Sequence, residues 1–380
     1  MSVKKIMAIF IALSLIILNP FTTHAQDLPY ITAQAAIVMD VESGCIVYSK
    51  NANKRMYPAS TTKILTSIMA LEMGKLEDVV QISAESAQVG EASIYLYPGH
   101  KIKLINLIKG ALIKSGNDAA HALGEYVAGD ESLFVYLMNK KAILLGSEMS
   151  NFCNTNGLPD DNHITSAKDL AFIARYAMHN KEFAEIVNTK QDVIEFIDGE
   201  KRYLKNTNKL LWKYSYADGI KTGTTRKAGN CLVASATKDG RQFLAVILKS
   251  YDRYGDAKKL FQYAFNNFEI YFRSKNTSFG RVSVKNGDKV NTELIIPHDI
   301  AAICDKNNMD GLQIKPEVPR YIEAPLFRGK KVGKVEIILN GKTVDTAPLI
   351  VTEDIVAKSW IKRIQNWFTN TLPQVIKILH

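Results

Sequence analysis

The sequence lacks the residue patterns that mark several large classes of protein. It has only four cysteines and seven histidines in 380 residues, with no Cys-x-x-Cys pair and no His-Glu-x-x-His spacing, so the common metal-binding patterns are missing. Lysine and arginine outnumber acidic residues by 48 to 38, yet no basic block resembles a nucleic-acid-binding arm. We therefore expect no metal site, no cofactor and no nucleic-acid partner. Neither a collagen repeat nor a sustained heptad pattern occurs.

The remaining composition is that of an ordinary globular protein. Hydrophobic residues make up 47% of the chain and charged residues 23%, which is enough apolar material for a core. At about 100–200 residues per domain, this length predicts two or three domains.

The first residues indicate export. Lys4 and Lys5 precede an apolar run of 13 residues from Ile6 to Leu18, and a small residue, Ala25, follows a short polar stretch. A membrane span needs about 20 apolar residues, whereas this three-part pattern is typical of a secretory signal peptide. We assign residues 1–25 to a signal peptide cleaved after Ala25.

The cysteines leave their redox state open. An exported chain with Cys45, Cys153, Cys231 and Cys304 permits disulfides. Cys45 and Cys231 nevertheless lie in apolar, strand-like runs, where a buried free thiol is more common.

Residues 26–274 read as one domain in which helices separate two groups of strands. The predicted strands cover 35–40, 45–49, 219–224, 231–236 and 242–248, and the predicted helices cover 61–73, 104–128, 132–145, 166–178 and 256–268. Gly74 closes the first helix, and Thr165 is the expected N-cap of the fourth. This order predicts an α+β fold, in which both ends of the domain complete one antiparallel sheet with helices packed on it.

The remainder of the chain has two further patterns. Short alternating runs over residues 275–352 predict a small, separate all-β domain. Residues 353–380 then place aromatic and aliphatic side chains at spacings of three and four, with lysines and an arginine between them. We interpret this segment as an amphipathic helix in a membrane interface, which Pro373 kinks. The alternative is a helix packed on the protein's own surface.

Three short motifs carry the chemistry. Ser60 and Lys63 stand three residues apart at the start of a buried helix, where they share a face. Burial and the positive helix N-terminus should lower the pKa of the lysine, so that it acts as a base for the serine. Ser115 and Asn117 occupy a turn between helices, followed by Asp118 as a plausible N-cap.

The third motif, Lys221-Thr222-Gly223, lies in a predicted strand. There, alternation directs the lysine to one face, and the glycine lets a ligand approach the backbone. Each motif alone is weak, because Ser-x-x-Lys also occurs at Ser2, Ser235 and Ser359. The ordered set, with each member in the required element, is specific.

With these motifs the chain resembles the penicilloyl-serine transferases, and among them the low-molecular-mass penicillin-binding proteins that are D-alanyl-D-alanine carboxypeptidases. The likeness extends over nearly all of the expected mature chain. It includes Pro58 to Lys63, Ser115 to Ala120, Met138-Asn139, Asn156 to Leu158, Asp218 to Gly223 and Ala228 to Ala234.

The resemblance implies a role for each motif residue. Ser60 would be the nucleophile, Lys63 its base, and Ser115 the relay of a proton to the departing D-alanine. Asn117 would hold the substrate amide or Lys63. Lys221, Thr222 or Thr224, and Arg253 would bind the terminal carboxylate, and Gly223 belongs to the same substrate-binding strand. The backbone N–H groups of Ser60 and Thr224 would form an oxyanion hole.

The implied partners are a peptidoglycan stem peptide ending in D-Ala-D-Ala, β-lactams as covalent inhibitors, and the membrane surface. The implied location is the outer face of the cytoplasmic membrane or the cell wall. Between Asn117 and Lys221 the Glu-x-x-Leu-Asn motif of class A β-lactamases is missing, and its match at Glu336–Asn340 lies in the expected β domain. We therefore expect slow release of bound β-lactam. A DD-endopeptidase and a penicillin sensor without turnover remain alternatives.

Overall fold

The protein is described by a computed structural model covering residues 28–358. The expected signal peptide lies outside the described residues, as does the expected C-terminal helix from residue 359 onward. The described beginning of that helix is extended instead: Ile355 and Ala357 form β-bridges with Leu326 and Gly287. Ile355 is buried in the core of the neighbouring sheet, which explains why the chain remains extended there. Among the described residues, no helix has the length and apolarity to cross a membrane.

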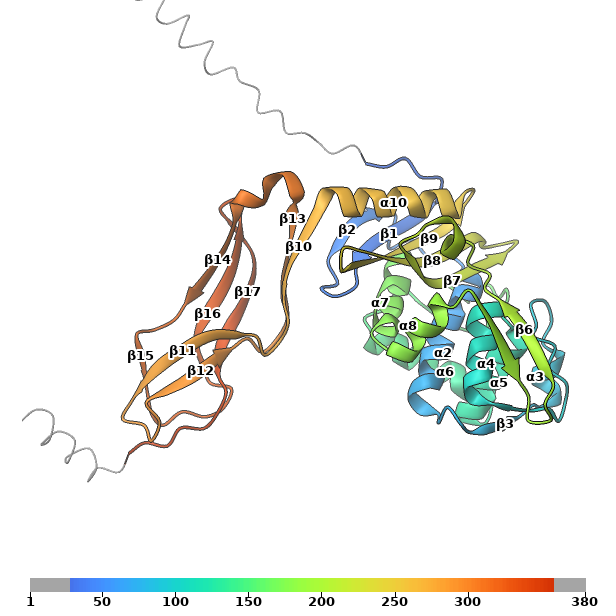
Figure 1. Cartoon of the computed structure of the whole chain (residues 1–380), viewed down its shortest axis with the longest axis horizontal. Helices are drawn as coiled ribbons and strands as arrows, with labels where there is room; N and C mark the ends of the chain where they lie inside the picture. The colour runs from blue at the N-terminus through green and yellow to red at the C-terminus, as the bar shows by residue number, and fades with distance from the viewer. Residues whose placement is uncertain (1–27, 359–380) are drawn as a thin grey trace, which may run out of the picture. The chain divides into compact units, whose positions relative to one another are not determined.

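The two ends of the first domain, residues 31–267, meet in one antiparallel sheet (Figure 1). Its strand order is β2-β1-β9-β8-β7, so the first strands of the domain pair with the last. The strands are β1 (Ala35–Asp40), β2 (Ile46–Lys50), β7 (Ala217–Thr225), β8 (Gly229–Lys238) and β9 (Arg241–Ser250). β8 and β9 join through Asp239 and Gly240, both at positive φ, as an Asp-Gly hairpin requires. The predicted α+β fold is confirmed.

Alternate residues of the sheet enter two different cores. Ile37 and Val246 pack with the helical part of the domain, whereas Val38 and Ile247 pack against α10 (Arg253–Asn267) on the other face. The helical part comprises α2 (Lys63–Met73), α3 (Ala84–Gln88), α4 (Leu104–Lys109), α5 (Asn117–Ala128), α6 (Glu131–Leu144), α7 (Ala167–Met178), α8 (Lys181–Asn188) and α9 (Leu210–Lys213). It also contains two short two-stranded sheets. One pairs β3 (Val79–Gln81) with β4 (Lys101–Lys103), and the other pairs β5 (Gln191–Glu195) with β6 (Lys201–Lys205).

The C-terminal sheet, within residues 268–351, is a separate layer with its own apolar core. Its order is β14-β16-β17-β12-β11-β15, with a further pair β10-β13. The strands are β10 (Phe268–Arg273), β11 (Ser278–Lys285), β12 (Asn291–Ile295), β13 (Ile300–Asp305), β14 (Leu312–Glu317), β15 (Tyr321–Glu323), β16 (Lys331–Leu339) and β17 (Lys342–Val351). The 3₁₀ turn η3 (Lys306–Gly311) connects β13 to β14.

Several expected helix ends are shifted. The N-cap of α7 is Ser166, whose side chain accepts the Asp169 N–H, rather than Thr165. α10 begins at Arg253, three residues earlier than expected, because Asp252 is its cap. Gly74 ends α2 in an extended conformation and not in the left-handed one. It is required by packing, since a Cβ there would lie 2.3 Å from a Leu104 methyl carbon.

All four cysteines are free. Cys231 and Cys304 are buried, and Cys45 and Cys153 are partly exposed. Burial raises the pKa of each thiol, to about 11 for Cys231 and Cys153. These cysteines are therefore poorly reactive thiols in the described fold.

Candidate active site

Ser60 and Lys63 lie at the junction of a 3₁₀ turn and a buried helix. The turn η1 (Ala59–Thr62) runs directly into α2, which begins at Lys63. Lys63 Nζ lies 3.0 Å from Ser60 Oγ, 2.6 Å from Asn117 Oδ1 and 2.7 Å from the Asn156 carbonyl oxygen. The sequence spacing thus brings the hydroxyl and the amine into direct contact.

Lys63 is fully buried, and its pKa is well below the usual value. Burial is the main cause, followed by the positive charge of Lys221, while Asp118 and Glu91 act in the opposite direction. A neutral amine has two N–H donors and one lone pair. The Asn117 and Asn156 oxygens match the two donors, so the lone pair is left for the proton of Ser60. A serine hydroxyl next to an amine of lowered pKa is the arrangement that general-base activation of a nucleophile requires.

Ser115 stands where a helix changes direction. Residues Gly110–Lys114 form the π-helical turn η2 after α4, and Ser115 follows at φ 72° before α5 begins. Ser115 Oγ accepts a hydrogen bond of 2.9 Å from Lys221 Nζ. The left-handed residue breaks the helix and turns the serine into the cleft, which it lines together with Ser60.

Asp118 is not the N-cap of α5, a position that Gly116 occupies. Its buried carboxylate instead accepts hydrogen bonds from Ser93 Oγ and the backbone N–H groups of Ile94 and Leu96. Asp118 thus anchors the segment 93–96, which runs into the cleft edge at Glu91 and Ala92.

Strand β7 forms the opposite side of the site. Lys221 is buried, and burial, followed by the charge of Arg253, lowers its pKa to about 7. Thr222 Oγ1 shares a hydrogen bond of 2.8 Å with Thr207 Oγ1. Arg253 Nη1 donates to the Gly223 carbonyl oxygen at 3.0 Å and to Thr224 Oγ1 at 2.9 Å. Two cationic side chains and two threonines therefore converge where an anion could bind.

Two glycines allow the walls to approach the nucleophile. A Cβ on Gly223 would lie 2.9 Å from the Ser60 backbone nitrogen. A Cβ on Gly157, which has φ +88°, would lie 1.9 Å from the Ala59 carbonyl oxygen. Side chains at these positions would push β7 and the loop after Asn156 away from Ser60.

These elements enclose a cleft of about 250 Å³. Every site residue predicted from the sequence except the two buried lysines lines it directly, and Lys63 and Lys221 reach it through Ser60 and Ser115. The lining comprises Ser60, Glu91, Ala92, Lys114, Ser115, Asn117, Gly157, Leu158, Thr207, Thr222, Gly223, Thr224, Thr225 and Arg253.

The sequence motifs did not identify several supporting residues. His163 shares a 2.9 Å hydrogen bond with Thr62 Oγ1 and accepts from the Cys153 N–H, and burial lowers its pKa to about 4. It is therefore a neutral clamp on the nucleophile's turn. His163 lies 101 residues from Thr62, so no local pattern could reveal the pair.

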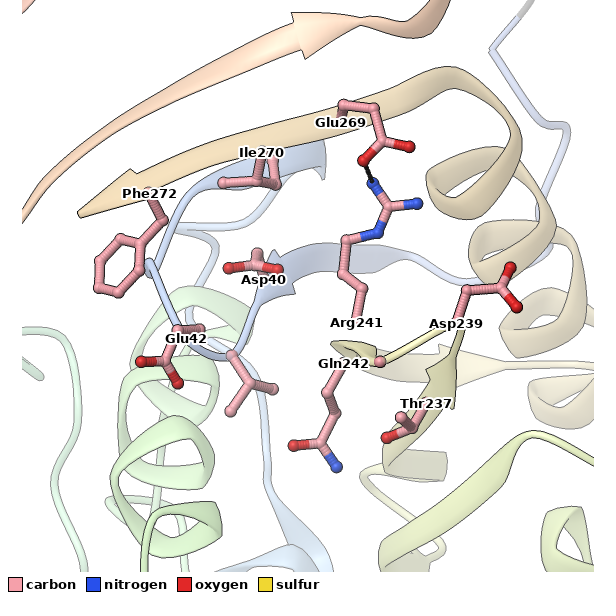
Figure 2. A pocket seen from close by; sticks show the side chains of 11 residues that line it. Asp40, Glu42, Thr237, Asp239, Arg241, Gln242, Glu269, Ile270 and Phe272 are labelled. Carbon is pink, nitrogen blue, oxygen red and sulfur yellow. Dashed lines mark hydrogen bonds and ion pairs between the residues drawn. The ribbon is translucent and has the colours of Figure 1, made fainter. Parts of the chain in front are cut away.

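A larger hollow of about 650 Å³ lies elsewhere, bordered by Asp40, Glu42, Arg241 and Glu269 (Figure 2). Arg241 reaches across it to Glu269, with the two charged groups 2.7 Å apart. Its lining includes no serine, cysteine or lysine. The hollow therefore lacks the nucleophile and base found in the smaller cleft.

One group of side chains in the described part of the chain has metal-ligand chemistry. His100, Asp198 and Glu200 place ligand atoms within 4.8 Å of one another. The two acids are exposed, and Glu200 forms an ion pair with Arg202 at 2.8 Å. This arrangement is a surface ion-pair cluster outside the catalytic cleft.

The cleft brings a serine hydroxyl into contact with a buried lysine amine, beside two threonines and an arginine. Comparison with known proteins gives the family. The chain belongs to the D-alanyl-D-alanine carboxypeptidase family, whose sequence model matches residues 21–251. A second model, described as the penicillin-binding protein 5 C-terminal domain, matches residues 265–357. The resemblance inferred from the motifs is confirmed.

Curated relatives are similar over most of their length. DacF, a D-alanyl-D-alanine carboxypeptidase of Bacillus subtilis, is 32% identical, with 87% of each chain covered. DacA of Haemophilus influenzae is 31% identical over 94% of this chain and 96% of its own. Penicillin-binding protein 5 from Haemophilus influenzae has a solved structure that matches with a TM-score of 0.76 and 31% identity, covering 87% of this chain and 99% of the other.

Proposed function

We propose that this chain is a serine-type carboxypeptidase that removes the terminal D-alanine from peptidoglycan stem peptides ending in D-Ala-D-Ala. The observation that carries the proposal is the contact of Ser60 Oγ with the buried amine of Lys63. The other two hydrogen bonds of this amine are to the Asn117 side-chain oxygen and the Asn156 carbonyl oxygen. Family membership supplies the substrate class. Removal of this residue would limit cross-linking.

The acylation step follows from the contacts. Ser60 Oγ attacks the carbonyl carbon of the penultimate D-alanine as its proton passes to Lys63. The backbone N–H groups of Ser60 and Thr224 stabilise the oxyanion, a contribution of about 10²–10³ in rate per donor. The peptide C–N bond then breaks, and the proton that Lys63 took from Ser60 passes through Ser115, which is hydrogen-bonded to Lys221, to the departing amine, so that Lys63 is neutral again.

Hydrolysis restores the enzyme. A water molecule attacks the ester carbonyl while Lys63 takes its proton, and the ester C–O bond breaks as Ser60 Oγ regains a proton. During acylation, before the D-alanine leaves, Lys221, Thr222, Thr224 and Arg253 hold the terminal carboxylate of the substrate. Asn117 orients Lys63 through its 2.6 Å contact.

β-Lactams would acylate Ser60 and leave slowly. Glu336, the first residue of the only Glu-x-x-Leu-Asn match, lies on β16 in the C-terminal sheet, where it forms an ion pair with Lys334. The cleft lining contains no glutamate other than Glu91. Rapid turnover of penicillin by the purified protein would contradict this expectation.

The site of action would be outside the cytoplasm, at the outer face of the cytoplasmic membrane or in the wall. The pattern of residues 1–25 supports export, and the basic, aromatic segment near the C-terminus supports membrane association. Truncation after Lys358, which keeps the buried Ile355 and its β-bridge, should release the protein from membranes while peptide hydrolysis continues. Continued sedimentation of the truncated protein with membranes would exclude this anchor.

The decisive experiment measures free D-alanine released from a short peptide ending in D-Ala-D-Ala. The mature chain should release it catalytically, and Ser60→Ala should not. Release by both proteins would exclude Ser60 as the nucleophile. If neither releases it although both are folded, cross-linked muropeptides become the test substrate for the endopeptidase alternative. Stable acylation by penicillin without any hydrolysis would instead favour a sensor.

A further inference from the structure

The catalytic cleft contains a single acidic side chain. Lys114 and Arg253 also line it, and Lys221 lies buried behind Ser115. Glu91 is the only acid in the lining, and it is exposed. The cleft therefore has several positive groups and one negative group.

Arg253 and Glu91 belong to different walls, whereas Lys114 lies at the end of the π-helical turn before α5. Arg253 is hydrogen-bonded to strand β7 through Gly223 and Thr224. Glu91 is held on the wall of α5: Asn117 Nδ2 donates to the Gly90 carbonyl oxygen at 2.8 Å, and the Asn117 N–H donates to the Ala92 carbonyl oxygen at 2.7 Å. Both residues that flank Glu91 are thus fixed to the asparagine that orients Lys63.

Glu91 also has an unfavourable backbone conformation. Its φ is +65°, in the left-handed region that glycine occupies without steric cost. Its carboxylate has no hydrogen bond or ion pair among the described residues, and its one internal interaction is the effect of its charge on the pKa of Lys63. A strained residue with an unpaired charge at the edge of a cleft suggests a role toward a ligand.

We propose that Glu91 is a specificity-determining residue that binds a positively charged amine on the acyl part of the peptide substrate. This inference rests on the proposed function, in which the terminal carboxylate lies near Arg253 and Lys221. The departing D-alanine then offers no further charged group, so a cation that meets Glu91 belongs to a residue before the scissile bond. We therefore expect a preference for peptides that carry a free side-chain amine on the acyl side of the scissile bond.

A pair of peptides tests this preference. One is Nα-acetyl-L-lysyl-D-alanyl-D-alanine with a free ε-amine, and the other has the same amine acetylated. For the unaltered protein we expect kcat/KM for D-alanine release to be about five- to tenfold higher with the free amine at low salt, as for a partly desolvated charge pair. Raising the ionic strength should reduce this ratio.

The variant Glu91→Gln keeps the side-chain size and removes the charge. Its ratio between the two peptides should fall to below about twofold, while Glu148→Gln, at an exposed acid outside the cleft, should keep the original preference. Comparing the two peptides within each variant cancels any change in the acylation step itself. Glu91→Gly should also lose the preference, with an unchanged or higher midpoint of thermal unfolding, because glycine tolerates the positive φ.

The outcomes separate the two proposals. Hydrolysis of both peptides with equal efficiency by the unaltered protein overturns the role of Glu91 and leaves the carboxypeptidase intact. The same conclusion follows if Glu91→Gln retains the preference. Hydrolysis of neither peptide by the folded, unaltered protein overturns the proposed function and, with it, this inference.

Discussion

The peptidase domain and the C-terminal sheet both have apolar cores, but they differ in the polar groups that they bury. Two lysines, two asparagines, an aspartate and a histidine of the active site and its support are almost completely buried in the first. Among the described residues of the second, Thr292 is the only buried polar side chain. Burying a charge or an unpaired polar group opposes folding. The buried polar groups of the active site therefore lower the stability of the peptidase domain, and the C-terminal sheet has no comparable set of buried groups among its described residues.

The largest effect should come from filling the gap between β7 and Ser60. In Gly223→Ala the new methyl group meets the Ser60 backbone nitrogen and displaces the strand. Acylation by a fluorescent penicillin should slow by about 10²–10³-fold, since small shifts at a reacting centre have effects of this size. Gly240→Ala is the control: that glycine has open space but φ +76°, so stability should fall while acylation continues. Normal acylation of Gly223→Ala would show that the close approach is unnecessary.

The burial cost of Lys221 should depend on pH. Its pKa falls from 10.5 unfolded to about 7 folded, so the unfolded chain binds more protons between these values and stability increases as pH rises through this range. The cost is complete below pH 7. Lys221→Met should therefore gain stability over the unaltered protein by about 3 kcal/mol more at pH 6.5 than at pH 9.5, while losing activity. Thermal unfolding measures this difference, with the exposed Lys75→Met as control. A pH-independent difference would mean that Lys221 stays charged in the fold.

His163 should make the peptidase domain sensitive to mild acid. Its pKa is 6.5 unfolded and about 4 folded, so its contribution to stability is lost as pH falls from 6.5 to 4. His163→Gln should destabilise the protein by about 1–2 kcal/mol at pH 7, because the bonds to Thr62 and Cys153 are weakened. It should also flatten the loss of stability between pH 6.5 and 4. Denaturant titrations across this range measure how the free energy of unfolding changes with pH, with the exposed His179→Gln as reference. If this pH dependence is the same in His163→Gln as in the unaltered protein, the assignment is wrong.

The smallest effect is expected in the C-terminal sheet. Thr292 Oγ1 is buried without a hydrogen-bond partner, so Thr292→Val should raise the free energy of unfolding by about 0.5–1 kcal/mol. Thr62→Val should instead lower it by about 1–2 kcal/mol, because the Thr62 hydroxyl is bonded to Ala59 and His163. Opposite signs in chemical denaturation would support the comparison between the two regions, and equal signs would weaken it.

Much of the fold and the central chemistry could be predicted from the sequence. Ser60 and Lys63 are three residues apart in a helical segment, so their contact is local. The strand and hairpin patterns around Lys221 likewise predicted the antiparallel sheet. Contacts between distant segments were not accessible in this way: neither the Thr207–Thr222 hydrogen bond nor the clamp of Asn117 on Gly90 leaves a periodic signal.

The differences from expectation have specific physical causes. Gly74 ends α2 as predicted, although not in the left-handed conformation in which glycine commonly caps helices, because it makes room for Leu104 and Tyr126. Asp118 has the residue type of an N-cap and instead ties down the segment 93–96. In both cases tertiary packing outweighs a local preference.

Because of the π-helical turn Gly110–Lys114, the direction in which Ser115 points depends on the number of residues that precede it. Such a turn holds one residue more than an α-helical turn, as though a codon had been inserted into a regular helix. Deleting one of these five residues would let the helix continue, and each position beyond it would rotate by about 100° around the axis. Ser115 would then face away from Lys221, although every catalytic residue would still be encoded. Inactive descendants of this enzyme can therefore arise by a three-nucleotide deletion that leaves all of its motifs intact.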